Sequence, residues 1–378
     1  MSNKGRYLRN DRKDFGSKPK KNNGLKIALI VMSVVLVLVI GLGIAGVVYV
    51  NNMMNLVNRP EPTENELSQE QLDDILNYNP DATTEPEEVP TTEPAPTLSS
   101  NPADNIINIM VVGQAYREGE ETKLADSMIL CSLNKETKTL TMTSFLRDMY
   151  IKLPDYKGHI CGKQRINVCY NLGWHWGGDL GAMEMLNLCL KNNFGIEVDH
   201  DIEVNFDVFP DIIDMMGGVD VELTEAEVEY LKNVYDNDKN DYVQVGMNTL
   251  NGYTALAYAR ARKLDGDIQR TNRQRNIITS LINKARTMSI SDLNKMAKEV
   301  LPMITTNMSN EEMAGYLMTV LPMIKDLKIQ SGVIPAEGTY WPETKDIGGY
   351  PANVLIPDLN ANSRILQEIC EGIVPAVK

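Results

Sequence analysis

The amino-acid sequence predicts an α/β fold: a central mixed β-sheet covered by helices on both faces, preceded by one transmembrane helix. Short apolar runs of strand length are bounded by turn residues, and longer segments repeat apolar residues with the period of a helix. A third observation is an uncharged run near the N-terminus that is long enough to cross a bilayer. With 378 residues, the chain can hold one large soluble domain after its N-terminal segments are set aside.

The first fifty residues have the pattern of a membrane anchor. Residues 1–26 contain nine Lys or Arg and two Asp, a charge of +7, and are expected to form a basic cytoplasmic tail. Residues 27–50 are twenty-four positions without a charge, which at about 1.5 Å per residue span a hydrocarbon core of roughly 30 Å. A cleaved signal peptide is the alternative, but its apolar core is normally about 7 to 15 residues long. The charge step predicts that the N-terminus is cytoplasmic and that everything after residue 50 is outside the cell membrane.

Residues 51–104 are rich in Pro, Thr and acidic side chains and show little apolar periodicity. Such a segment is expected to be an extended stalk that cannot bury enough surface to fold, although a short helix could form at residues 68–76. Because residues 1–26 carry +7 of the overall charge of −14, the remainder carries −21. This excess of acid disfavours nucleic-acid binding.

Residues 105–378 are expected to form one folded extracellular domain. Residues 106–112 are a nearly continuous apolar run, which is typical of a strand buried on both faces. Residues 126–133 and 139–144 are predicted to be paired neighbouring strands, and residues 219–223 alternate as a strand does. Helices are predicted from periodicity and from their ends at residues 180–192, 206–216, 250–258, 270–288, 290–304, 310–326 and 362–371, with Pro- and Gly-rich connections after residue 326.

The five cysteines form no CxxC pair and the three histidines have no zinc-like spacing, so a structural metal site is not expected. Cys161 and Cys169 are the nearest candidates for a disulfide in an extracellular domain. Cys131 and Cys189 stand among apolar neighbours and are expected to be buried thiols.

The strongest functional signal is positive charge concentrated in an acidic chain. Residues 257–276 hold five arginines and one lysine against two aspartates. The planar fork of an arginine matches phosphate or carboxylate oxygens two at a time, so an anionic ligand is indicated. If residues 258–262 are extended, Arg260 and Arg262 point to the same face. A solvated basic face making surface ion pairs is the alternative interpretation.

Two further features favour a site over a solvated face. Arg270 and Gln274 continue the apolar stripe of the following helix toward its N-terminal end, where free backbone N–H groups also favour an anion. Arg147 and Asp148 come just past a predicted strand end, a usual place for functional groups in α/β folds.

The segments NIMVVG, ADSMILCSLN, TMTSFLRDMYIKLP, RINVCYN, GGVDVEL, LNGYTALAYARAR and DIQRTNRQ, in this order, resemble the LytR-CpsA-Psr family of cell-wall polymer ligases over about residues 105–288. The resemblance implies transfer of an anionic glycopolymer, such as teichoic acid or capsular polysaccharide, from a polyprenyl-pyrophosphate carrier to peptidoglycan, with Mg²⁺. It also implies an apolar tunnel between sheet and helices for the lipid tail. It assigns the pyrophosphate contacts to Arg147, Arg260, Arg262, Arg270 and Gln274, a further substrate contact to Arg117, and the metal to Asp126.

Two positions depart from the family pattern. Ala115 stands where the family has a second acidic metal ligand, and Leu124 stands where it commonly has an arginine. Mg²⁺ often uses one or two carboxylates together with waters and phosphate oxygens, so these changes weaken the expected site without clearly abolishing it.

The resemblance leaves two questions open. Asp148 is either a general base or an acid that orients Arg147. The chain is expected to be an Mg²⁺-dependent phosphotransferase, and the alternative is a polyprenyl-phosphate-binding or regulatory protein of the cell envelope that does not turn its ligand over.

Overall fold

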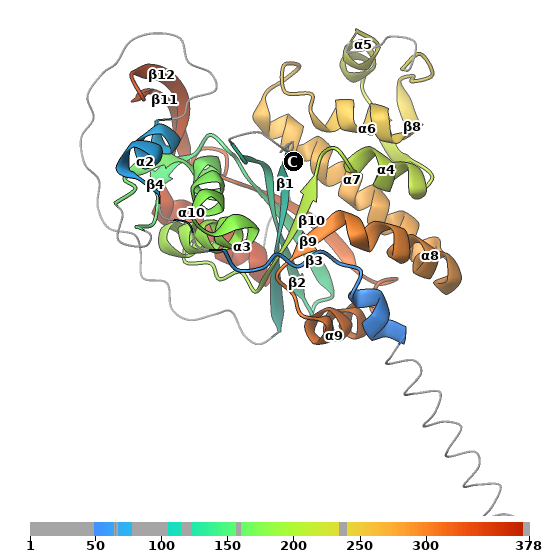
Figure 1. The fold of residues 1–378 in the computed structure, drawn as a ribbon. Helices are drawn as coiled ribbons and strands as arrows, with labels where there is room; N and C mark the ends of the chain where they lie inside the picture. Colours follow the sequence, from blue (N-terminus) through green and yellow to red (C-terminus); the bar gives the residue numbers. More distant parts are fainter. Residues whose placement is uncertain are drawn as a thin grey trace, which may run out of the picture. The chain divides into compact units, whose positions relative to one another are not determined.

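Six strands form the central sheet, in the order β10-β3-β2-β1-β6-β9 (Figure 1). In chain order they are β1 (Ile106–Gln114), β2 (Ala125–Asn134), β3 (Thr139–Phe145), β6 (His200–Asn205), β9 (Ile304–Thr306) and β10 (Lys328–Ile334). β2 is antiparallel to β1 and β3, and β9 to β6, whereas β6 is parallel to β1 and β10 to β3, so the sheet is mixed, as predicted. The computed structural model describes residues 49–63, 65, 67–77, 105–114, 122–155, 160–233 and 240–372.

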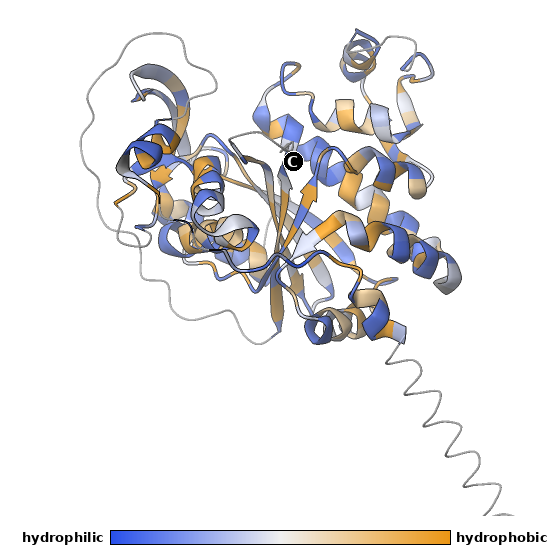
Figure 2. Ribbon diagram, viewed as in Figure 1, coloured by the Kyte–Doolittle hydropathy of each residue, from blue (hydrophilic) through white to orange (hydrophobic). Residues whose placement is uncertain are grey.

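The three strands predicted at residues 106–112, 126–133 and 139–144 are confirmed as β1, β2 and β3, each slightly longer than expected. β1 lies between β2 and β6, and its Met110 and Val112 are completely buried. This position explains why the run lacks the polar alternation of a half-exposed strand. Figure 2 shows the hydrophobic colour along the central strands and mixed colours on the helices.

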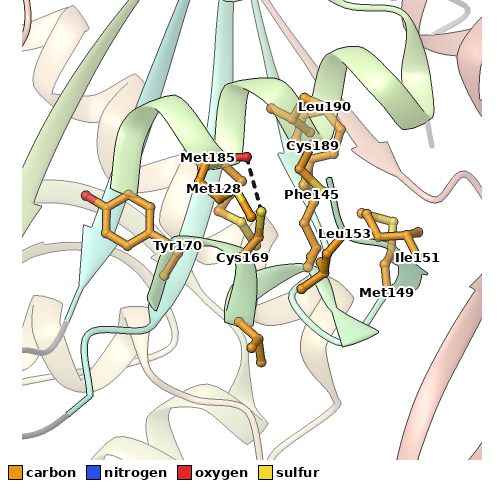
Figure 3. Close-up of a cluster of buried hydrophobic side chains, with 14 of the residues drawn as sticks. Met128, Phe145, Met149, Ile151, Leu153, Cys169, Tyr170, Met185, Cys189 and Leu190 are labelled. Carbon is orange, nitrogen blue, oxygen red and sulfur yellow. Dashed lines mark hydrogen bonds between the residues drawn. The ribbon is translucent and has the colours of Figure 1, made fainter. Parts of the chain in front are cut away.

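Helices cover both faces of the sheet. On one face, α3 (Ile166–Phe194) and α10 (Leu359–Glu371) bury apolar side chains of the strands, among them Met128 of β2 (Figure 3). On the other face lies α7 (Asp267–Thr287), where Ser127 of β2 donates to Gln274 at 2.9 Å. Because successive residues of a strand point to opposite faces, Ser127 and Met128 mark the two layers.

α3 is much longer than the helix predicted at residues 180–192. It begins at Ile166 and contains a kink at Gly177 and Gly178, both of which have non-helical backbone angles. Two adjacent glycines interrupted the sequence pattern, so only the second half was recognised as a helix. The halves pack closely, because a Cβ on Gly173 would lie 2.2 Å from the carbonyl oxygen of Gly181.

A smaller apolar cluster supports the segment that carries the arginines. It is built from α4 (Phe209–Met215), β7 (Val219–Leu223), α5 (Glu225–Asn233), β8 (Gly246–Leu250) and α6 (Gly252–Ala259). β7 and β8 pair antiparallel, and Ile213, Leu250 and Tyr258 are buried in the cluster together with Ile277 of α7. The strand at 219–223 and the helices near 206–216 and 250–258 are thereby confirmed, the first helix being shorter than expected.

The last ninety residues contain more strand than predicted. The helix expected at 290–304 is α8 (Ile290–Val300) followed by the 3-10 turn η2 (Leu301–Met303), and Ile304 already belongs to β9. The helix expected at 310–326 ends early as α9 (Asn310–Val320), and the expected connections contain β10 and the hairpin β11 (Tyr340–Ile347) and β12 (Tyr350–Pro357). This hairpin is not evident from the sequence, because both strands contain proline, which is unusual inside strands, and they are joined by Gly348-Gly349.

The expectation of an unfolded stalk is wrong for residues 51–77. Met54 and Val57 are each 5% exposed, and Asn58 exchanges backbone hydrogen bonds with Ile304 and Thr306 beside β9. The short helix is confirmed as α2 (Gln69–Leu76), which packs against α3 and buries Leu72. The segment has few apolar residues, but they lie where they contact the domain. Residues 78–104 lie outside the described part of the chain.

Within the described ranges, no helix is both long enough and apolar enough to cross a bilayer, and the predicted span falls almost wholly on residues that the structure does not describe. All five cysteines are free thiols, so the candidate pair Cys161 and Cys169 is not a disulfide. Cys169 instead donates its thiol to the carbonyl of Met185 at 3.1 Å (Figure 3). Cys189 is a buried thiol, as expected, and Cys131 is partly exposed.

Candidate functional site

Charged side chains from four parts of the chain meet at one end of the sheet. They come from the start of β2, from the loop after β3, from the junction between β5 (Lys163–Arg165) and α3, and from the turn between α6 and α7. β5 pairs with β4 (Tyr150–Lys152), which fixes the third of these segments beside the second. We define the arginine cluster as Arg147, Arg165, Arg262 and Arg270 together with Asp126, Asp148 and Asp267.

Arg147 and Asp148 join the cluster from consecutive positions. Arg147 Nη1 lies 2.5 Å from Asp126 Oδ1, and its Nε lies 3.9 Å from Asp148 Oδ1. The same oxygen of Asp148 is 4.0 Å from Nη1 of Arg165, whose side chain is only 2% exposed. Asp148 is thus surrounded by cations, which supports the interpretation that it orients arginines.

Arg262 and Arg270 complete the cluster from the opposite side. Arg262 Nη2 donates to Asp148 Oδ2 at 2.6 Å, and its Nε is 3.5 Å from Asp267 Oδ1. Arg270 Nη2 lies 3.0 Å from the same Asp267 oxygen and donates to the backbone carbonyl of Asp126 at 3.0 Å. Since Asp267 is the first residue of α7, the start of that helix is tied to the start of β2.

Four arginines and three aspartates give the cluster a net charge of +1. Burial lowers the pKa of Arg270, with the neighbouring arginines acting in the same direction and the aspartates opposing. Burial likewise raises the pKa of Asp148 against the opposing effect of Arg147 and Arg262. Both shifts arise because charged groups are held away from water.

Several polar atoms of the cluster are buried and have no hydrogen-bond partner among the described residues. They are Nε of Arg147, Nε of Arg270 and both carboxyl oxygens of Asp267, of which Arg147 Nε and Asp267 Oδ1 form the ion pairs given above but no aligned hydrogen bond. An unsatisfied buried donor typically costs about 1–3 kcal/mol, so such groups are rare unless a ligand or water serves them. Two free N–H groups on neighbouring arginines favour a ligand with several acceptor oxygens.

Gln274 lies beside the cluster, but its polar atoms are used within the fold. Its Oε1 accepts from Ser127 at 2.9 Å, and its Nε2 donates to the Ala259 carbonyl at 3.4 Å. The side chain is 8% exposed. Gln274 therefore links α7 to β2 and to the end of α6, a position from which it holds the site together.

Arg260 does not share a strand face with Arg262, because the extended backbone on which that expectation depended is not present. α6 continues through Ala259, and Arg260 caps it with helical backbone angles before a turn. The Arg260 guanidinium lies over the Phe206 ring, 5.2 Å from its centroid. Only Arg262 enters the arginine cluster by a direct ion pair.

The remaining predicted positions have mixed outcomes. Arg117 and Ala115 lie in residues 115–121, outside the described ranges. Leu124 is partly buried against the apolar core beside α3. Two cluster members were missed: Arg165, which directly precedes α3 in the RINVCYN segment, and Asp267 of DGD, whose place in the first turn of a helix was the available signal.

The residues present are compatible with Mg²⁺ held through one carboxylate. The Asp126 side chain is 28% exposed, and only its Oδ1 forms a hydrogen bond, to Arg147. The described residues contain no group of three or more His, Cys, Asp or Glu arranged to hold a metal. Mg²⁺ commonly keeps several waters and binds one or two carboxylates plus phosphate oxygens, which is compatible with a single free oxygen beside the arginine cluster.

Two cavities lie away from the cluster. One of about 580 Å³ is lined by the second half of α3, residues 197–199 and Asn307, and one of about 640 Å³ lies between β7, β8 and α7. Neither is lined by a residue of the arginine cluster. The candidate site is therefore identified by its unsatisfied donors and its clustered charges, and not by a cavity.

Comparison with known proteins agrees with these features. The LytR_cpsA_psr family model matches residues 75–350, well over half of the chain. The chain is 34% identical over 216 residues to the polyisoprenyl-teichoic acid–peptidoglycan teichoic acid transferase TagU of Bacillus licheniformis, a match of 55% of this chain and 63% of that protein. The match therefore spans less than two thirds of that relative's length.

Solved structures share the fold. A crystal structure of TagV from Bacillus subtilis has a TM-score of 0.52 at 25% identity and covers 72% of this chain and 99% of its own. The LytR-CPS2A-psr family protein YwtF (TagT), solved with bound octaprenyl pyrophosphate lipid, has a TM-score of 0.50 at 20% identity and covers 74% and 97%. The latter likeness shows the fold alone. With its motifs in order and the family model matched over residues 75–350, the chain belongs to the LytR-CpsA-Psr family.

Proposed function

We propose that this chain is a membrane-anchored transferase that moves an anionic glycopolymer, of the teichoic acid or capsule type, from a polyprenyl-pyrophosphate carrier to peptidoglycan. The observation that carries this proposal is the arginine cluster, with its buried N–H groups that lack acceptors. The names of the relatives support the same substrate class, since TagU is described as a teichoic acid transferase.

The cluster is suited to phosphoryl transfer. The reaction asks a protein mainly to position the reactants and to neutralise charge on phosphate oxygens. A pyrophosphate would accept from Arg147 Nε and Arg270 Nε, the two buried donors without partners, and from Arg262, whose side chain is 37% exposed. Arg165, whose side chain is 2% exposed, would add positive charge from inside the domain without moving.

In the proposed reaction, a sugar hydroxyl of peptidoglycan attacks the phosphorus that carries the glycopolymer. A new phosphodiester bond forms, the bridging P–O bond of the pyrophosphate breaks, polyprenyl phosphate leaves, and the hydroxyl proton is released to water. The arginines stabilise the charge that develops on the leaving phosphate. Asp126 would hold Mg²⁺ together with phosphate oxygens, and the metal would supply further charge neutralisation there.

The lipid tail is proposed to lie between the sheet and α3, as the family resemblance implies. This layer holds Met110, Met128, Met149 and Met185 in one buried cluster with Tyr170 (Figure 3). Methionine side chains are unbranched and adaptable, so they can repack around a flexible chain at lower cost than branched ones. The N-terminal apolar run would anchor the chain, with the domain outside the cell.

The alternative, a protein that binds polyprenyl phosphate without turnover, is favoured by Ala115 in place of an acidic ligand. A transfer assay separates the two. The full chain in nanodiscs is supplied with a lipid-pyrophosphate-linked oligomer, a peptidoglycan acceptor and Mg²⁺, and release of polyprenyl phosphate is followed. Arg262→Ala should lower the rate by roughly 10² to 10³, since a lost transition-state contact is worth about 2.7 to 4 kcal/mol.

Arg364→Ala is the matched control, because Arg364 is an exposed arginine of α10 outside the cluster. Its rate should equal that of the wild type. Tight lipid binding with no turnover in any variant would support the binding protein. Equal rates for Arg262→Ala and Arg364→Ala would remove the arginine cluster from the reaction.

A further inference from the structure

α9 has one face on the sheet and one face without a partner among the described residues. Its Tyr316 and Val320 pack against a cluster formed by Ile107, Leu133 and Leu327. On the opposite side, Met318 is 73% exposed and Leu321, directly after the helix, is 45% exposed. Met318 and Leu321 are three positions apart, so their exposed side chains lie next to each other at the end of the helix.

The N-terminal end of the folded unit lies beside α9. Asn51, the first residue of this unit, accepts a hydrogen bond from Asn310 at the start of α9 at 2.9 Å, and Asn55 accepts from the same amide. Arg59 donates to the Met308 carbonyl at 2.7 Å and to Asn310 Oδ1 at 2.6 Å. The chain therefore enters the domain at a fixed point beside α9 and not through a loose linker.

The predicted membrane span ends at residue 50, one residue before Asn51. A helical residue advances by about 1.5 Å, so a bilayer surface at the end of the span lies close to the start of α9. We infer that the exposed face of α9 rests on the outer leaflet of the membrane, with Met318 and Leu321 in the interfacial layer. This inference rests on the membrane anchor proposed above and is independent of the reaction.

The geometry has a consequence for the substrate. α9 packs at the end of the sheet where β2 finishes, near Leu133, whereas Asp126 lies where β2 begins. Seven residues separate them, which at about 3.3 Å per residue is roughly 23 Å. The arginine cluster is therefore held at the end of the sheet away from the bilayer, and a lipid-linked pyrophosphate reaches it only when part of its tail has left the membrane.

Site-specific quenching tests the contact. The full chain carrying Met318→Cys or Leu321→Cys is labelled with nitrobenzoxadiazole and reconstituted in nanodiscs of phosphatidylglycerol and phosphatidylethanolamine, with or without spin-labelled acyl chains. An interfacial helix inserts roughly 5–10 Å, so the lipid-borne quencher should lower emission at both positions by at least about twofold. Met247→Cys, at a side chain of β8 that is 66% exposed, is the matched control and should change little. Labelled wild type measures the background from Cys131.

Equal quenching at positions 318 and 247 would overturn the inference. So would extraction of the full chain from membranes by alkaline carbonate, because that result removes the anchor. Neither outcome depends on turnover, so a chain that binds lipid but transfers nothing would still show quenching at 318 and 321 if α9 lies on the bilayer.

Discussion

Replacing Asp148 by asparagine should tighten pyrophosphate binding without destabilising the unliganded domain. Asp148 lies 2.6 Å from Arg262 and within 4.0 Å of Arg147 and Arg165. Its carboxylate is the internal anion that neutralises these arginines, so a bound pyrophosphate competes with it. Removing that charge raises the net charge of the arginine cluster from +1 to +2.

The magnitude follows from Coulomb's law. Two unit charges about 5 Å apart interact by roughly 3 kcal/mol at an effective dielectric constant of about 20. Solvent and salt at this half-open edge reduce the gain to about 1–2 kcal/mol, so affinity for pyrophosphate should rise by roughly tenfold. Without ligand, burial raises the pKa of Asp148, so the ionised carboxylate is disfavoured by folding and removing its charge should not lower the free energy of unfolding.

The assay is calorimetric titration of the full chain in micelles with inorganic pyrophosphate and with farnesyl pyrophosphate, paired with thermal unfolding. Asp292→Asn is the control, because Asp292 is an exposed acid of α8 with a 55% exposed side chain. Weaker binding by Asp148→Asn would refute the reasoning. It would mean that Asp148 contributes to binding by orienting the arginines more than it competes with the ligand.

Lowering the pH tests the role of the Asp148 carboxylate in a second way. Burial raises the pKa of Asp148, and Arg147 and Arg262 oppose the shift. An acid whose pKa is raised on folding favours the folded state below its unfolded pKa, and this contribution is lost as pH rises through the raised value. As pH falls through that value, the wild type should bind pyrophosphate more like Asp148→Asn, and the difference between the two titrations should shrink.

Three further predictions concern stability, each measured by urea unfolding of the full chain in micelles. Leu72→Ala, at a side chain of α2 that is 1% exposed, should lower the free energy of unfolding by about 2–5 kcal/mol. Leu56→Ala, at a side chain that is 39% exposed, should change it little. Equal effects of the two substitutions would show that residues 51–77 do not pack on the domain. Arg273→Met should destabilise by about 3–5 kcal/mol because it leaves Glu227 buried without its cation, and a loss below about 1 kcal/mol would show that the pair is not structural. Burial raises the pKa of Asp201 to about 6, so about 3 kcal/mol of stability should be lost between about pH 4 and about pH 7 in the wild type; the same loss in Asp201→Asn would assign the pH dependence to another group.

The core of the fold could be predicted because its signals are local. The strand at residues 106–112 and its two neighbours are apolar runs bounded by turns, and they became β1, β2 and β3. The missed elements depend on contacts between distant segments. β12, for example, reaches the loop after β3 through a bridge between Met149 and Leu355, and its prolines Pro351 and Pro357 leave it without a regular strand pattern.

The site could be predicted in part for the same reason. Arg147, Arg262 and Arg270 were identified from charge and from their positions at strand and helix ends, and the structure brings them together. Arg260 and Arg262 share a face only if their backbone is extended, and the helical angles of Arg260 at the end of α6 place its guanidinium over Phe206 instead. The direction of a side chain can be inferred from its position only when the secondary structure is known. A helix taken for a strand therefore gives a wrong side-chain direction.

The arginines of residues 260–275 differ in how closely their guanidinium groups are held by acidic or carbonyl partners. Arg273 bonds Glu227 at 2.7 Å and the Ala261 carbonyl at 2.6 Å, and it also pairs with Asp265, so it has short partners throughout. Arg262 has one short partner, Asp148, and its second ion pair, to Asp267, is 3.5 Å long. Arg270 keeps a buried Nε without an acceptor. At Arg262 a pyrophosphate has one short partner, Asp148, to displace, whereas at Arg273 it would have to replace Glu227, Asp265 and the Ala261 carbonyl together. The arginines that can change partner are therefore those at the end of the sheet, beside Asp126, whose second carboxyl oxygen forms no hydrogen bond with a described residue.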